Sequence, residues 1–134
     1  MAHSIQTFAG KSDIFNDTDL LVVIGLALDI ISESAAFEEL RPLALEWERA
    51  IKEYGPGVLD LKLEHGLETP NQQRVFGDLM EEILSRCVEY KSRIPASTLN
   101  ERISAPGVTF FDYDVAAVTA ALEKLRHLTA KRTS

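Results

Sequence analysis

Histidine is the side chain most often used for metal binding and for acid–base catalysis, and this chain of 134 residues contains three. They are His3, His65 and His127, and no two are spaced so as to place two metal ligands on one helix. Glu123 and His127 are four residues apart, but they stand outside any HExxH pattern. We therefore expect them to form an exposed charged pair, and we predict no metal and no other cofactor.

The single cysteine, Cys87, is a candidate nucleophile. It stands in a stretch where apolar pairs recur every four residues: Val75/Phe76, Leu79/Met80, Ile83/Leu84 and Cys87/Val88. A cysteine in such a stripe is expected to pack in the core, where its thiol is unreactive. Since there is no second cysteine, an intramolecular disulfide is excluded and a reducing compartment is favoured. We find no catalytic residue in the sequence and predict that the protein is not an enzyme.

Asp29 stands between Leu28 and Ile30 in the most apolar segment of the chain. Burying an unpaired carboxylate is costly, so Asp29 must emerge at the rim of the core or pair with a cation. The candidate partners are Arg41, Arg49 and Arg86. We favour this structural role over a catalytic one, for which Asp29 or His65 would have to lie at the base of a deep pocket.

The chain is acidic, with a net charge of -7, and its charge is unevenly distributed. Residues 1–90 contain 17 acidic and 7 basic residues, whereas residues 91–134 contain 4 acidic and 7 basic ones. The field of such a protein repels nucleic acids and anionic membrane surfaces, so neither is expected as a partner. The longest apolar stretch, Leu20 to Leu28, is about half the length of a membrane span. A basic protein partner would meet the first two thirds of the chain.

Five carboxylates form the candidate partner-binding surface, because they surround one predicted helix and the alternating segment that follows it. They are Glu46, Glu53, Asp60, Glu64 and Glu68. Apolar residues are interleaved with these acids, so the surface can attract a basic partner over a distance and then hold it through apolar contacts. The alternative for each residue is that its charge only keeps the protein soluble.

Apolar periodicity and breaking residues predict two helices in the first half of the chain. The first extends from about Thr18 to Glu33 and is apolar nearly all round, as expected of a central element. Its β-branched run, Val22–Ile24, leaves a buried strand as the alternative. A short helical turn precedes the second helix, which begins at Pro42 and ends before Gly55-Pro56-Gly57.

Capping residues predict two further helices in the second half. Thr69 and Gln72 form a capping box, so the third helix begins there and carries the apolar stripe that includes the cysteine. Either Asp112 or Asp114 caps the last helix, which continues to about Ala130.

The remaining segments have weaker patterns. Val58–Glu64 alternates between apolar and charged residues, which predicts a half-buried strand. Val108–Phe111 is a strand or an extended segment that plugs the core. Thr98–Glu101 resembles a capping box for a short helical turn. Residues 1–16 are polar and weakly patterned, so we expect them to be partly flexible.

Together these patterns predict a single helical domain spanning residues 1–134. The expected fold is an all-α compact bundle of four to five helices with at most one short two-stranded β element. A signal-peptide pattern is not apparent, so we expect a cytoplasmic protein. The expected function is binding of a basic protein partner, as an inhibitor or immunity protein that neutralises a toxin or enzyme. The alternative is a homo-oligomeric subunit, such as a homodimer, whose apolar helix faces pair with a second copy.

Overall fold

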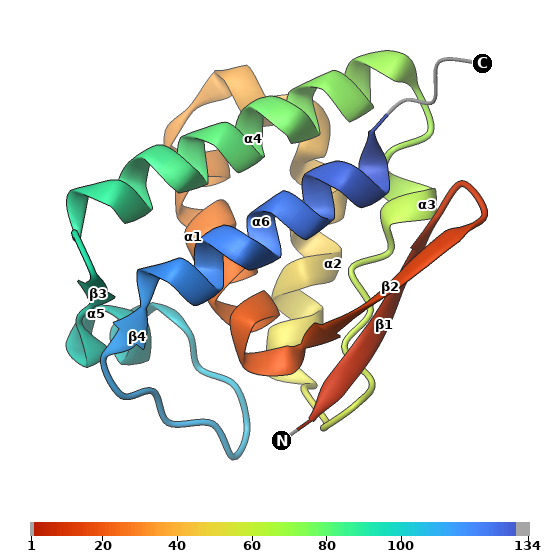
Figure 1. The fold of residues 1–134 in the computed structure, drawn as a ribbon. Coiled ribbons are helices and arrows are strands. Elements are labelled where there is room, and N and C mark those ends of the chain that lie inside the picture. The colour runs from red at the N-terminus through yellow and green to blue at the C-terminus, as the bar shows by residue number, and fades with distance from the viewer. Residues whose placement is uncertain (1, 131–134) are drawn as a thin grey trace.

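The computed structural model describes residues 2–130, so both ends of the predicted domain lie outside the described residues. Within this range the chain is mostly helical, with two antiparallel sheets of two strands each (Figure 1). The elements are β1 (His3–Phe8), β2 (Lys11–Asn16), α1 (Asp17–Glu33), the 3₁₀ helix η1 (Ala35–Leu40), α2 (Arg41–Lys52), α3 (Leu63–Gly66), α4 (Pro70–Glu89), β3 (Arg93–Ile94), α5 (Ala96–Arg102), β4 (Tyr113–Asp114) and α6 (Val115–Thr129). A mostly helical fold with a small β element is confirmed. Residues 2–130 form six α-helices and two small sheets, whereas the sequence predicted four to five helices and at most one two-stranded element.

Helix α1 is the central element of the fold. It contacts α2, α4, α5, α6 and η1, which explains why its residues are apolar on nearly every side. The Asn16 side chain accepts hydrogen bonds from the amides of Thr18 and Asp19 and so caps its N-terminus. The strand alternative for Val22–Ile24 is wrong, because these residues lie in the buried middle of the helix.

Two helical glycines have opposite surroundings and therefore predict opposite effects of an added methyl group. A Cβ at Gly25 of α1 would overlap the side chain of Ile103, whereas a Cβ at Gly77 of α4 would have no atom within 4 Å. We expect Gly25→Ala to destabilise the protein by about 1 to 3 kcal/mol through overpacking. Gly77→Ala should instead stabilise it by about 0.5 to 1 kcal/mol, because alanine favours helix. Thermal unfolding of both variants checks this pair, and equal shifts in the same direction would contradict it.

The helix starts predicted from capping residues are largely confirmed. Thr69 and Gln72 form both hydrogen bonds of the capping box at the start of α4, and Pro42 stands in the first turn of α2. Of the two aspartates offered for the last helix, Asp114 is the cap. The capping box predicted at Thr98 is wrong, because α5 already begins at Ala96.

The apolar stripe of α4 is buried along most of its length. Six of its eight members are buried: Val75, Phe76, Leu79, Met80, Ile83 and Cys87. Leu84 is only half-buried, and Val88, one turn further along the same side of the stripe, is 62% exposed, whereas the neighbouring Cys87 is fully buried. Figure 1 shows α4 beside α6, and the two helices are in contact.

The N-terminal hairpin β1–β2 was not predicted, because it carries both polar and apolar side chains on its buried face and isoleucines on its outward face. Ser4 and Gln6 point inward and are only 2% and 1% exposed, whereas Ile5 and Ile14 point outward. Two aromatic side chains, Phe8 and Phe15, complete the buried face. A strand that buries polar side chains and exposes isoleucine does not follow the pattern by which half-buried strands are recognised.

The strand predicted over Val58–Glu64 is wrong: residues 58–62 keep the alternation without forming a strand, and Leu63 and Glu64 already belong to α3. Leu59 and Leu61 are buried while Asp60 is exposed. Side chains bind the backbone groups that a strand partner would bind. Gln6 donates to the Leu59 carbonyl at 2.7 Å and accepts from the Leu61 amide at 2.9 Å, while Ser4 accepts from the Leu59 amide and Trp47 donates to the Leu61 carbonyl.

Segment 108–111 is held in the same way. It forms no strand, and the Asn100 side chain binds both the amide and the carbonyl of Phe110, at 2.8 and 2.9 Å. Of the two predicted alternatives, the extended segment that plugs the core is the one observed, because Phe110 is buried. Phe111 is 83% exposed. The short β3–β4 sheet follows directly, pairing Arg93 with Asp114.

Candidate functional site

A groove of about 370 Å³ lies between the second half of α2 and the segment that follows it. Three acidic residues line it, namely Glu46, Glu53 and Asp60. Its apolar lining consists of Ala50, Tyr54, Val58 and Leu59. We call this feature the acidic groove. Val58 is 72% exposed, so the groove presents a free apolar side chain beside its carboxylates.

The acidic groove brings together three of the five carboxylates selected from the sequence. Glu64 lies next to it, in a smaller hollow of about 180 Å³ that shares Asp60 and Lys62 with the groove. Glu68 lines neither hollow and is exposed just before α4. Helix α2 and the segment after it therefore bring four of the five predicted carboxylates close together, whereas Glu68 lies apart from them.

Two basic side chains, Arg49 and Lys62, also line the groove and reduce its negative charge. Arg49 is within 3.8 Å of Glu46, and both side chains are well exposed at 66% and 38%. An exposed ion pair of this kind is weak and screened by salt, so a partner can displace it at little cost. Glu53 and Asp60 are exposed as well, so they remain accessible to a cation.

A buried aspartate, Asp17, fixes the wall of the acidic groove. It is 1% exposed and accepts hydrogen bonds from the Tyr54 hydroxyl at 2.7 Å and the Gly57 amide at 2.8 Å. Its other oxygen accepts from the Ser4 hydroxyl, which in turn accepts from the Leu59 amide. The position of Asp17 in the first turn of α1 adds the favourable field of a helix N-terminus.

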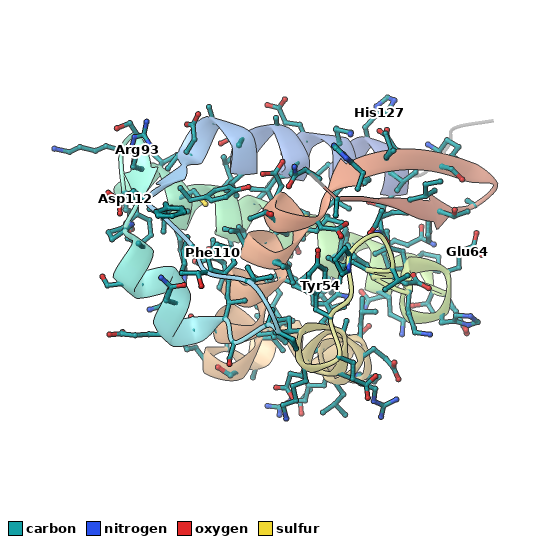
Figure 2. The ribbon with its side chains drawn as sticks, turned by 90° about the horizontal axis from the view of Figure 1, so that it is seen from below. Tyr54, Glu64, Arg93, Phe110, Asp112 and His127 are labelled. Carbon is teal, nitrogen blue, oxygen red and sulfur yellow. The ribbon has the colours of Figure 1, made fainter. Side chains whose placement is uncertain are left out.

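Tyr54 connects this buried network to the surface of the groove (Figure 2). Burial, followed by the hydrogen bond to Asp17, raises the pKa of its hydroxyl to about 12. The hydroxyl therefore stays protonated at neutral pH and remains a donor to the carboxylate. A second tyrosine, Tyr113, donates to Asp19 in the same helical turn, and burial raises its pKa as well. Loops from both halves of the chain thus converge on the start of α1.

The Trp47 side chain supports the groove from beneath. Its indole nitrogen donates to the Leu61 carbonyl at 2.9 Å, and the whole side chain is 1% exposed. Neither this bond nor the roles of Ser4, Gln6 and Asp17 were predicted from the sequence. The partners of Asp17 lie 13 to 40 residues away in the chain, so no local pattern marks it.

Asp29 forms an ion pair at the rim, as expected, but not with an expected partner. Its carboxylate lies 2.8 Å from the guanidinium of Arg102, and none of the three predicted arginines takes this place. Arg86 pairs instead with Glu33 and Glu82. The contacting oxygen of Asp29 is buried and lacks an aligned hydrogen-bond donor, so Arg102 supplies charge rather than a well-directed bond.

The residues weighed for catalysis and metal binding do not converge. Burial raises the pKa of the Cys87 thiol to about 11, so the thiolate needed for attack is suppressed at neutral pH. His65 is exposed and lines the smaller hollow next to Glu64. In Figure 2 the hairpin separates Glu64 from His127, so the two histidines do not face a common site. Among residues 2–130, no three histidine, cysteine or carboxylate side chains are grouped to hold a metal ion.

The same described range contains no helix that is long and apolar enough to cross a membrane. Comparison of the chain with protein-family models, with curated proteins and with solved structures finds no match.

Proposed function

We propose that this protein binds a basic segment of another protein in the acidic groove. The observation that supports this most is the convergence of Glu46, Glu53 and Asp60, from two parts of the chain, around a groove with apolar lining. In its fuller form the proposal is that the protein is an inhibitor or immunity protein that occludes a basic toxin or enzyme. This fuller form rests on the net charge of -7 and the small size of the chain.

The lining of the groove suits a lysine or arginine side chain. Such a side chain can lay its aliphatic stem on Ala50, Tyr54 and Val58 while its charged end reaches Glu53 or Asp60. The Asp17 network holds Tyr54 and segment 57–59 in place, so little ordering is needed on binding. The negative field of the first two thirds of the chain would speed the encounter with a cationic partner.

Charge reversal at the groove tests the proposal. We expect the triple variant E46K/E53K/D60K to associate with a synthetic lysine–serine peptide at least about tenfold more slowly at low salt, because steering depends on these carboxylates. The matched control E89K/E101K/E123K changes the net charge equally at exposed sites outside the groove. Stopped-flow or surface-plasmon measurement over a salt series would give the association rates.

The control separates a local site from a general charge effect. The groove variant should lose most of the salt dependence of the association rate, whereas the control variant should keep most of it. Equal slowing of the two variants would show that only the overall charge matters and would contradict the proposal. Failure of the wild-type protein to bind the peptide at low salt would contradict it as well.

A further inference from the structure

We propose that the outward face of the β1–β2 hairpin, centred on Ile5 and Ile14, is an apolar docking patch. Its occupant is the same partner, whose basic residues are then interleaved with apolar ones. This inference rests on the proposed function, because it assigns to the partner of the acidic groove a second, apolar contact.

The outward isoleucine pair of the hairpin is the first observation that supports the patch. Ile5 and Ile14 are directly opposite in the strand register and are 65% and 54% exposed, so they form one cross-strand apolar pair. The positions behind them are occupied by Ser4 and Gln6, which are buried. The hairpin already covers the core with Phe8 and Phe15, so the two isoleucines on its outward face add nothing to core packing, and their pairing there indicates a contact surface.

Continuity with the acidic groove is the second observation. Ile5 lines the smaller hollow together with Asp60 and Glu64, and Asp60 also lines the groove. The exposed Val58, two residues before Asp60 in the sequence, lines the groove as well. One partner segment can therefore contact the isoleucine pair and the carboxylates at the same time.

The hairpin is held rigidly enough to act as a preformed surface. Gln6 and Ser4 fasten its inner face to segment 59–61, as described above. On the side of β2, the Lys124 ammonium group donates to the Ile14 carbonyl, and the Lys11 ammonium group donates to the His127 carbonyl at 3.2 Å. Contacts at both strands reduce the ordering cost of binding an extended or helical partner.

The charges beside the patch decide which apolar partner fits it. Asp60 and Glu64 flank the hollow that Ile5 enters, with Lys62 as the basic residue between them. Together with Glu46 and Glu53, these acids outnumber the two basic residues, Arg49 and Lys62, that line the groove and the smaller hollow. A basic segment with interleaved apolar side chains complements this arrangement, whereas an acidic or purely polar segment does not.

The double variant I5T/I14T tests the patch, because threonine keeps the β-branched shape that strands favour while removing apolar surface. The probes are a lysine–leucine peptide and a lysine–serine peptide of equal length and charge. We expect the wild-type protein to bind the lysine–leucine peptide about tenfold more tightly, which corresponds to the added apolar contact. In the double variant this preference should fall to within about twofold, with the lysine–serine affinity unchanged. The control V88T removes an exposed valine from α4 and should keep the preference.

Each result bears on one of the two proposals. Equal wild-type affinity for the two peptides would overturn the apolar patch and leave the acidic groove standing. Failure of both peptides to bind would overturn the proposed function and the patch with it. Sedimentation of the wild-type protein and of I5T/I14T provides a further check: a wild-type dimer that the substitutions dissociate would assign the patch to self-association and overturn the inference. Circular dichroism would confirm that the double variant is folded.

Discussion

Replacing Asp17 with alanine is expected to destabilise the protein by about 3 to 5 kcal/mol, because three donors lose the buried carboxylate that they share as acceptor. The Tyr54 hydroxyl, the Gly57 amide and the Ser4 hydroxyl all donate to this carboxylate. Alanine would also remove a negative charge from the positive end of α1. Urea unfolding monitored by the fluorescence of the single tryptophan, Trp47, measures the change.

A milder variant tests whether the network and not one bond accounts for this effect. Tyr54→Phe keeps the ring and removes a single donor to Asp17, so we expect a loss of about 1 kcal/mol. A loss of similar size in both variants would contradict the central role of the carboxylate. Because the network holds the groove wall, folded Asp17→Ala protein should also bind the lysine–serine peptide more weakly than the Tyr54→Phe variant does.

The second large effect is expected at Leu79 of α4. Leu79 is 0% exposed, and truncation to alanine should cost about 2 to 5 kcal/mol through lost burial and the cavity left behind. Val88 belongs to the same sequence stripe but is 62% exposed, so Val88→Ala should change stability by less than about 0.5 kcal/mol.

Denaturant unfolding of both variants measures the difference between the two positions. The periodic pattern of α4 treats Leu79 and Val88 as equivalent, whereas the structure separates them. Similar losses of stability at the two sites would show that the stripe is buried along its full length, against the structure. A loss at Leu79 alone would agree with the buried contacts of the middle of the helix.

The helical half of the fold could be predicted because its signals are local. Capping side chains act within three residues, and the side chains of one buried face recur every three to four residues along the same helix. The capping box of Thr69 and Gln72, the apolar stripe of α4 and the extent of the last helix were predicted for this reason. The partner of Asp29 was not, because Arg102 stands 73 residues away and many arginines satisfy the same sequence argument.

The candidate site was predictable in part. An excess of acid and its alternation with apolar residues indicated Glu46, Glu53 and Asp60, and these three do line one groove. The groove itself, its support by Asp17 and Trp47, and the exposed isoleucine pair depend on contacts between distant segments. Glu68 was selected by the same reasoning as the others, yet it lies apart from both hollows.

By itself the sequence determined that this protein is acidic, mostly helical and built around one apolar helix, because charge, capping and periodicity are properties of neighbouring residues. Only the tertiary structure decided how the extended segments are held. Gln6 and Asn100 bind the backbone of Leu59, Leu61 and Phe110, so two alternating or β-favouring segments need no strand partner. Buried backbone groups must be paired, but the sequence does not state which distant side chain will pair them.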